Sequence, residues 1–279
     1  MFKVQSMRAD NSHIINHEYK SFTFPGGEIH PTLEVSNKIE YNKSKVVIEA
    51  RLNSGNDIIE LLMLNSIIDK NFKGFEKELK LYYTMFSRQD RAANIGEAES
   101  LKVFCNLINS MNFDKVITFD NHSDVANALL NNNEEVTQLD LVKRAIPIPS
   151  EYDYVISPDA GANKKTLKVA QYLEIPVIQA DKTRDTLTGE ITGTVVYADW
   201  QTIGQTKVLI VDDICDGGRT VIEIVKILKE KGVDTINCFF THGIFSKGYD
   251  VLFNSGIDKI FTTNSFNTPE DDRIIKINI

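Results

Sequence analysis

Apolar residues follow two alternating patterns along this chain. Short continuous runs rich in Val and Ile, such as residues 208–211, are typical of strands buried on both faces of a parallel sheet. Longer segments, such as residues 220–231, place their apolar side chains at the spacing of one helix face. Because strand-like and helix-like segments follow one another throughout, the pattern predicts an α/β fold with parallel layers.

The predicted elements fall into two cycles. In the first, strands are predicted over residues 46–49, 78–85 and 115–119, with helices over 56–72 and 97–111. In the second, strands are predicted over 154–157, 175–180, 208–211, 235–240 and 259–262, with helices over 164–173 and 220–231. Between about residues 135 and 152 a polar segment gives way to the two prolines of AIPIPSEYD, which marks a boundary. We therefore assign residues 1–145 to one domain and residues 146–279 to a second.

Length, charge and cysteine content narrow the class of protein. The 279 residues suit two domains of ordinary size, each able to bury its own core. A net charge of −8 without a basic run argues against nucleic-acid binding. The longest apolar runs fall far short of the roughly 20 residues of a membrane helix, and the amino-terminal segment lacks the apolar core of a signal peptide. Cys105, Cys215 and Cys238 are widely spaced and typical of reduced thiols, so we expect a cytoplasmic protein.

The most informative stretch is KVLIVDDICDGGRT, residues 207–220, where a buried strand leads into acids, a glycine turn and a helix. Its candidate ligand-binding residues are Asp212, Asp213, Asp216, Gly217, Gly218, Arg219 and Thr220. Ligands of open α/β sheets bind at this edge. Glycine backbone N–H groups and a helix start favour a phosphate, and the acids suit ribose hydroxyls, directly or through a divalent cation. A lone DDxxD would be read as an ordinary capped turn, but the whole string predicts a ribose-phosphate site.

This stretch resembles the phosphoribosyl-diphosphate (PRPP) binding motif of type I phosphoribosyltransferases and of ribose-phosphate diphosphokinases, the PRPP synthetases. Five further motifs follow the order of the diphosphokinase family: FPGGE (24–28), SRQDR (87–91), TFDNHSD (118–124), SPDAGANKK (157–165) and ADKTRD (180–185). SRQDR discriminates best, because it is similar to the Ala-Arg-Gln-Asp-Arg signature that simple phosphoribosyltransferases lack. The resemblance implies two phosphoribosyltransferase-like domains, each a mainly parallel sheet flanked by helices.

The resemblance also implies roles for residues in the first domain. Phe24 and Glu28 would bind adenine, reaching into a neighbouring subunit's site, although Gly26 replaces the family's usual Asp. Arg88 and Gln89 would bind ATP, and the planar guanidinium suits phosphate oxygens. His122 would help to bind both ATP and the metal of Mg-ATP.

In the second domain the resemblance implies an acceptor site and a catalytic flap. Asp159 would be a second Mg²⁺ contact, and Gly161 would allow the backbone to approach a phosphate. Lys182 and Arg184 would be the catalytic residues, since preorganised cations stabilise the charge that develops during phosphoryl transfer. Asp212 and Asp213 would hold ribose hydroxyls, and residues 216–220 the 5-phosphate.

The implied reaction transfers the β,γ-diphosphate of Mg-ATP to the C1 hydroxyl of ribose 5-phosphate, giving PRPP and AMP. The implied assembly is a homo-oligomer with the ATP site near a subunit interface. One departure from the family leaves the acceptor open: Gly217 replaces a threonine of the phosphate loop and Arg219 replaces a glycine. A larger acceptor such as ADP-ribose is therefore an alternative.

Two further alternatives concern the class of activity. A non-catalytic regulator associated with a PRPP synthetase is one, although the retention of Lys182, Arg184, His122 and Asp159 argues against it. A simple phosphoribosyltransferase is the other, and it would have no use for SRQDR.

Overall fold

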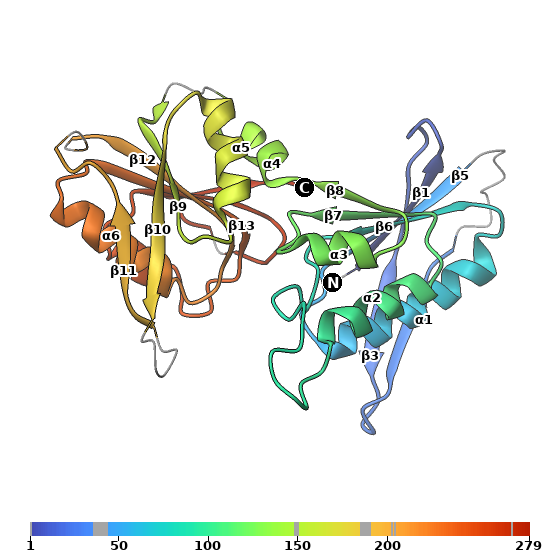
Figure 1. Ribbon diagram of the computed structural model, residues 1–279. Coiled ribbons are helices and arrows are strands. Elements are labelled where there is room, and N and C mark those ends of the chain that lie inside the picture. Colours follow the sequence, from blue (N-terminus) through green and yellow to red (C-terminus); the bar gives the residue numbers. More distant parts are fainter. Residues whose placement is uncertain are drawn as a thin grey trace. The chain divides into compact units, whose positions relative to one another are not determined.

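The computed structural model describes residues 2–35, 44–147, 151–184, 191–201, 203, 205–268 and 270–279, without the side chains of residues 182–184, 191 and 192. The chain divides into two compact units, Met1–Val136 and Thr137–Ile279. Figure 1 shows the strands of the first unit in blue to green and the helices and strands of the second from green-yellow to red. Both units are built on a mainly parallel sheet with helices packed against it, which confirms the predicted fold class.

The sheet of the first unit has the strand order β2-β1-β5-β6-β7-β8. Its strands are β1 (Phe2–Arg8), β2 (Ile15–His17), β5 (Ser44–Ala50), β6 (Glu76–Leu81), β7 (Lys115–Phe119) and β8 (Asn133–Val136). β5 to β8 pair in parallel, whereas β1 is antiparallel to both of its neighbours. A separate antiparallel hairpin is formed by β3 (Tyr19–Thr23) and β4 (Ile29–Leu33).

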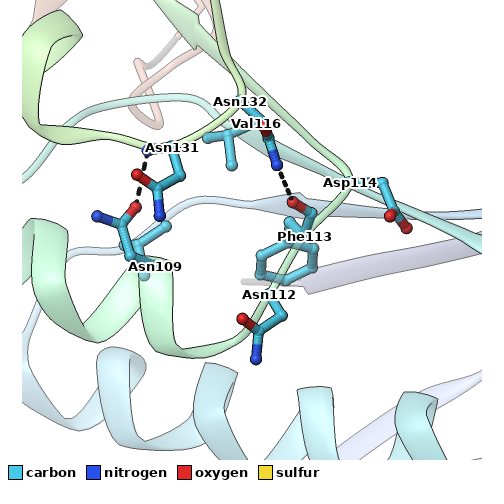
Figure 2. A pocket seen from close by; sticks show the side chains of 8 residues that line it. Asn109, Asn112, Phe113, Asp114, Val116, Asn131 and Asn132 are labelled. Atoms are coloured by element: carbon cyan, nitrogen blue, oxygen red, sulfur yellow. Dashed lines mark hydrogen bonds between the residues drawn. The ribbon is translucent and has the colours of Figure 1, made fainter.

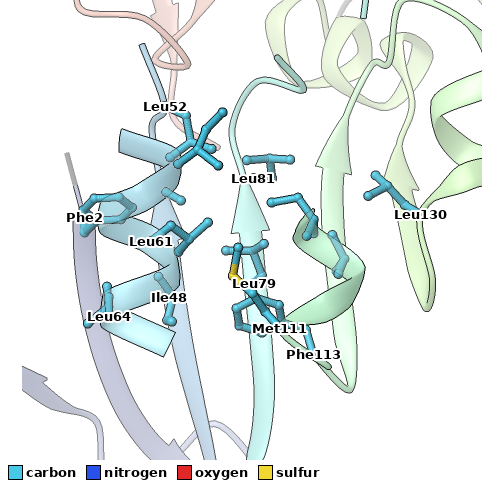
Figure 3. Packing of buried hydrophobic residues seen from close by; sticks show 14 of the residues in the cluster. Phe2, Ile48, Leu52, Leu61, Leu64, Leu79, Leu81, Met111, Phe113 and Leu130 are labelled. Atoms are coloured by element: carbon cyan, nitrogen blue, oxygen red, sulfur yellow. The ribbon is translucent and has the colours of Figure 1, made fainter. Parts of the chain in front are cut away.

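Helix α1 (Gly55–Asn71) shows how the local sequence builds this unit. A capping box starts it: the Ser54 hydroxyl accepts from the Asp57 N–H, and the Asp57 carboxylate accepts from the Ser54 N–H. Leu61 and Leu64 then face Ile48 of β5 and Leu79 of β6 in a core that Figure 3 shows between helix and strands. Each of these side chains is at most 1% exposed, and full burial of a leucine contributes about 1.5–3 kcal/mol. The other helices of the unit are α2 (Ser100–Ser110) and α3 (Asp124–Leu129).

The sheet of the second unit has the strand order β11-β10-β9-β12-β13-β14-β15. Its strands are β9 (Tyr154–Ser157), β10 (Val177–Arg184), β11 (Ile191–Tyr197), β12 (Lys207–Cys215), β13 (Thr235–Gly243), β14 (Lys259–Thr263) and β15 (Ile274–Ile277). All neighbours are parallel except β10 and β11. Residues 208–211 of β12 are 0% exposed, so the apolar run is a central strand as predicted.

The helices of the second unit are α4 (Gln138–Ala145), α5 (Asn163–Leu173), α6 (Arg219–Glu230) and α7 (Asp250–Phe253). α4 contacts α5, β13 and β15, so it belongs to this unit. The division between Val136 and Thr137 therefore lies before the position at residues 145 and 146 that the prolines suggested, although it falls inside the predicted segment. Within the described ranges, no helix is both long and apolar enough to span a membrane.

Candidate functional site

The acids of the DDICD stretch lie at the carboxyl end of the central strand of the second unit. β12 continues through Asp212 and Asp213 to Cys215, and it pairs in parallel with β13 from Lys207 to Asp212 and again at Ile214 and Cys215. The predicted strand ended at residue 211, because acids are uncommon in buried strands. The acids are consequently held by a sheet ladder, which fixes their position at the edge where ligands of parallel sheets bind.

Three carboxylates approach one another at this edge. Burial, and then the charges of Asp213 and Asp159, raise the pKa of Asp212 well above its usual value. Asp159 comes from the turn after β9, where its Oδ1 accepts from the Ala162 N–H at 3.1 Å. A Cβ on Gly161 would lie 3.3 Å from that same Oδ1, so the glycine leaves room for the carboxylate. The structure therefore brings together Asp159, Asp212 and Asp213, three of the residues predicted for the site.

Lys165 of α5, the last residue of the SPDAGANKK motif, is a further partner of this cluster. Its Nζ lies 3.4 Å from Oδ2 of Asp213, a side chain that is 9% exposed. A cation at this distance partly offsets the repulsion between the carboxylates. The signal in the sequence was its place in the first turn of the helix that follows SPDAG.

The glycine turn after β12 exposes the start of helix α6. Gly218 is the N-cap and has φ +72, and no side chain caps the helix. The first N–H groups of α6 have no partner within the helix, so they offer an anion site reinforced by the helix dipole. A Cβ on Gly218 would lie 2.5 Å from Cδ2 of Leu252, so both the backbone angle and the packing require glycine here.

Arg219 is turned along the helix surface. Its Nε donates to Oε1 of Glu223 at 3.0 Å, and Oε2 of Glu223 accepts from the Thr194 hydroxyl of β11 at 2.6 Å. Arg219 thus has a carboxylate partner on its own helix. Cys215, just before this loop, is 2% exposed, and burial raises the pKa of its thiol, so the thiolate form is disfavoured.

Lys182 and Arg184, the predicted catalytic residues, lie near the carboxyl end of β10. The backbones of Lys182 and Arg184 belong to β10, which pairs with β11 and shifts register between Thr183 and Arg184. Their side chains lie outside the described residues, as do residues 185–190. Their catalytic role remains a prediction.

In the first unit, His122 stands on a turn that a buried polar network holds. Asn121 is 3% exposed, and its N–H donates to Oε1 of Glu135 at 2.8 Å. Its side-chain NH₂ donates to the Thr118 hydroxyl at 2.8 Å and to Oδ1 of Asn127 at 2.6 Å. Asp120, before it, is 1% exposed and has φ +43. His122 itself is exposed, so the network orients a solvent-facing histidine at the carboxyl end of β7.

The SRQDR turn is connected to the His122 turn. The Thr84 hydroxyl donates to Oδ1 of Asn121 at 2.5 Å, which joins the segment after β6 to the turn after β7. Arg88 and Gln89 are exposed in the turn that follows, where the Gln89 N–H donates to the Phe86 carbonyl at 2.8 Å. The structure therefore brings the SRQDR and DNH segments to one edge of the sheet. Asn121 and Thr84 were not predicted.

A stacked tyrosine supports the same edge. The Arg51 guanidinium lies 3.8 Å from the centre of the Tyr82 ring, and the Tyr82 hydroxyl donates to Oε2 of Glu49 at 3.1 Å. Burial, followed by the charge of Glu49, raises the pKa of Tyr82 to about 12. Tyr82 is thus a neutral hydrogen-bond donor that fixes the chain just before Thr84 and SRQDR.

FPGGE forms the tip of the β3–β4 hairpin. The Phe24 N–H donates to the Glu28 carbonyl at 2.8 Å, and Gly27 has φ +92, which is a glycine conformation. Phe22 and Phe24 contact each other with ring centres 4.7 Å apart, and they are 53% and 44% exposed. Exposed aromatics on a projecting hairpin are typical of a surface that contacts another molecule.

Carboxylate and imidazole side chains are the candidate ligands for a divalent metal. In the part of the chain that the structure describes, no group of three or more His, Cys, Asp or Glu side chains is arranged to hold a metal ion. His122 and Asp159, the two predicted ligands, belong to different units. Mg²⁺ is commonly held by one or two carboxylates together with water and substrate phosphates, so a single carboxylate such as that of Asp159 suits this mode of binding.

A cavity of about 200 Å³ lies in the first unit, at the amino ends of β7 and β8. Figure 2 shows its asparagines engaged within the turns: Oδ1 of Asn109 accepts from the Asn131 N–H at 2.9 Å, and Asn132 donates to the Phe113 carbonyl at 3.0 Å. These amides stabilise turns with positive φ at Asn112 and Asn132. The cavity is therefore part of the turn structure, at the opposite end of β7 from His122.

Comparison with known proteins agrees with these features. The family described as "Phosphoribosyl transferase domain" matches residues 134–270. A ribose-phosphate pyrophosphokinase of Sulfurisphaera tokodaii is 30% identical over 222 residues, which are 76% of this chain and 71% of that protein. One of Mycoplasmopsis pulmonis is 26% identical over 263 residues, which are 91% of this chain and 78% of that protein.

A solved structure shows the same fold. The crystal structure of phosphoribosylpyrophosphate synthetase from Mycobacterium smegmatis superposes with a TM-score of 0.78, covering 94% of this chain and 86% of that chain at 19% identity. The similarity in fold extends over both units of the chain. The protein belongs to the ribose-phosphate pyrophosphokinase family, the family of the PRPP synthetases.

Proposed function

We propose that the protein is an ATP-dependent diphosphokinase that transfers the β,γ-diphosphate of ATP to the C1 hydroxyl of ribose 5-phosphate, giving PRPP and AMP. The assignment of the acceptor rests on the position of Asp212 and Asp213 at the end of β12, directly before the uncapped start of α6 at Gly218. Carboxylates and open N–H groups at this separation along the chain suit the two ends of one ribose phosphate. The family to which the chain belongs supports the reaction class.

The proposal assigns each half of the reaction to one unit. Asp212 and Asp213 bind the ribose hydroxyls, and residues 216–220 bind the 5-phosphate. Arg88, Gln89 and His122 bind ATP, and the Thr84–Asn121 hydrogen bond supports this assignment because it fixes their two turns together.

In the transfer itself, the C1 oxygen forms a bond to the β-phosphorus and loses its proton to solvent. The bond between that phosphorus and the α,β-bridging oxygen breaks, and AMP leaves with the oxygen. Lys182 and Arg184 stabilise the charge on the phosphate oxygens. No covalent intermediate with the protein is required.

Magnesium is proposed as the metal that accompanies ATP. His122 and Asp159 would hold it, together with the phosphates. When bound, it would neutralise charge on the triphosphate. The proximity of Asp159, Asp212 and Asp213 supports a cation nearby, since a positive charge would relieve the repulsion between these carboxylates.

The exposed Phe22–Phe24 cluster supports a homo-oligomer. In this assembly, Phe24 and Glu28 of one subunit contact the adenine bound by its neighbour, so that the ATP site lies near a subunit interface. The cytoplasm is proposed as the compartment on the basis of the buried, reduced cysteines.

A second acceptor is favoured by one observation. Gly217 contributes no side chain to the phosphate loop, and Arg219 stands at its end, so a longer anionic substituent such as that of ADP-ribose is a candidate. The product would then be ADP-ribose pyrophosphate.

The test is to incubate the purified protein with Mg-ATP and either ribose 5-phosphate or ADP-ribose, and to separate the nucleotides by chromatography. AMP formed with ribose 5-phosphate is the expected result. AMP formed with ADP-ribose but not with ribose 5-phosphate would show that ADP-ribose is the acceptor. AMP formed with neither would exclude the kinase activity and favour a non-catalytic regulator, whereas diphosphate released from PRPP with a nucleobase would indicate a phosphoribosyltransferase.

A further inference from the structure

The side chain of Lys247 lies against Gly217, the first glycine of the phosphate loop. A Cβ built on Gly217 would lie 3.5 Å from Cε, 3.6 Å from Cδ and 3.9 Å from Cγ of Lys247, and these are its three nearest atoms. Lys247 comes from the loop after β13, 30 positions further along the chain than Gly217. Because residue 217 has no side chain, the lysine stem packs directly on the loop backbone.

The segment that carries Lys247 is anchored to the phosphate loop by its backbone. The N–H groups of Ile244 and Phe245 donate to the Cys215 carbonyl at 2.9 and 3.1 Å, and the Ser246 N–H donates to the Asp216 carbonyl at 3.2 Å. Phe245 has φ +48, an uncommon conformation for a bulky residue, and its buried ring packs with Phe240. The base of Lys247 is therefore fixed relative to residues 215–217, while its ammonium group is at the end of an exposed side chain.

The cations around the loop differ in their partners. Arg219 is paired with Glu223 at 3.0 Å, and Lys165 is paired with Asp213 at 3.4 Å. Within the described ranges of the chain, Lys247 forms no ion pair. A lysine ammonium is a point charge with three donors on a flexible stem, which suits a phosphate next to an open helix start.

We propose that Lys247 is a phosphate-binding residue of the acceptor site. Its ammonium group donates to the 5-phosphate that the N–H groups of residues 216–220 surround, and it takes over the contact of the threonine hydroxyl that Gly217 replaces. The identity of the ligand as a ribose phosphate rests on the proposed function. A cation in place of a neutral hydroxyl makes the site selective for an acceptor whose 5-substituent carries negative charge.

Calorimetric titration of ribose 5-phosphate in the absence of ATP tests this assignment. Hydrogen bonds to charged groups predict that Lys247→Met weakens the Kd by about tenfold to a hundredfold, whereas Lys247→Arg stays within about threefold of the unmodified protein. Lys259→Met is the matched control, because Lys259 is exposed at the amino end of β14 in the same sheet and its loss changes the net charge equally. Lys247→Met with an unchanged Kd, or a loss of equal size in Lys259→Met, would overturn the proposal.

A paired substitution tests the exchange between residues 217 and 247. Gly217→Thr added to Lys247→Ala restores the hydroxyl, and the double variant should bind ribose 5-phosphate at least about threefold more tightly than Lys247→Ala alone. No gain would contradict the exchange.

The binding experiment separates this inference from the proposed function. If ribose 5-phosphate binds in a Lys247-dependent way but yields no AMP with Mg-ATP, the proposed kinase reaction is wrong and the proposed phosphate contact is retained. If ADP-ribose binds and ribose 5-phosphate does not, the same order of variants is expected with ADP-ribose. Binding of neither compound by the unmodified protein would overturn the phosphate contact as well.

Discussion

The Thr84 hydroxyl donates a 2.5 Å hydrogen bond to the side-chain oxygen of Asn121, and both residues are buried. The two residues stand 37 positions apart, on segments that leave neighbouring parallel strands. Since Asn121 directly precedes His122, and Thr84 closely precedes SRQDR, this one bond fixes the relative position of two predicted ATP-binding segments.

Thr84→Val should weaken both stability and ATP binding. The change removes a buried donor from Asn121, which predicts a loss of about 1–3 kcal/mol in the free energy of unfolding and a higher KM for ATP. Urea unfolding and steady-state kinetics measure the two effects. Thr32→Val is the control, because Thr32 is exposed on the β3–β4 hairpin. Equal losses in the two variants would contradict a specific role for Thr84.

Gly218→Ala should disrupt the phosphate loop. Its φ of +72 costs roughly 1 kcal/mol for an L-residue, and a clash with Leu252 adds to this, so we expect a total loss on the order of 2–4 kcal/mol. Gly232→Ala measures the cost of the positive φ alone, because Gly232 has φ +83 and a Cβ there would meet nothing within 4 Å. Thermal unfolding of both variants and of Gly218→Ala/Leu252→Ala measures the difference. A loss no larger than that of Gly232→Ala would exclude the clash.

Asp212→Asn should change the pH dependence of stability. Because the folded-state pKa of Asp212 is raised, this carboxyl contributes stability that is present below its ordinary pKa and is lost as pH rises through the folded value. The variant has no such loss, so its Tm relative to the unmodified protein should increase with pH across this window, while ribose 5-phosphate binding is lost.

Differential scanning calorimetry between pH 4 and 8 would follow this effect, with the exposed Asp272→Asn as the control. Parallel Tm profiles for Asp212→Asn and the unmodified protein would show that the carboxylate repulsion does not act. Added Mg²⁺ should stabilise the unmodified protein more than Asp212→Asn.

Lys182→Ala should reduce kcat by a factor of about 10² or more while leaving the Kd for ATP within a few-fold, since a cation that acts mainly on the developing charge affects the transition state most. Rapid-quench measurement of AMP and equilibrium binding of an ATP analogue distinguish the two quantities. Lys168→Ala, on the exposed face of α5, controls for the lost charge. An unchanged rate would remove Lys182 from the reaction.

The sequence predicted best those elements whose signal is local. β7 and β9 have the predicted limits, and the helices α1, α5 and α6 differ from them by at most one residue at each end, because apolar periodicity and glycine boundaries define them. β3 and β8 were missed because none of their side chains is fully buried, so neither strand shows an apolar run. β12 was cut short at Asp212 because a buried acid contradicts strand propensity until its neighbours are known.

The same difference between local and long-range signals applies to the residues of the candidate site. Acids, glycines and basic residues next to strand ends were visible in the sequence, and the structure brings Asp159, Asp212 and Asp213 together. The contacts of Thr84 with Asn121, and of Lys247 with Gly217, join segments that are remote in sequence. Such contacts depend on strand order and on loop conformation, which no local pattern specifies.

The burial of Cys215 should make the phosphate loop resistant to thiol-modifying reagents, which the sequence alone does not indicate. The thiol is 2% exposed and its pKa is raised, so the thiolate that reacts with alkylating agents and peroxides is scarcely formed. Its carbonyl meanwhile holds the segment that carries Lys247. A cysteine in the middle of a substrate loop would ordinarily make an enzyme sensitive to oxidative inactivation, whereas here the loop should keep its shape and its affinity for phosphate after exposure to such reagents.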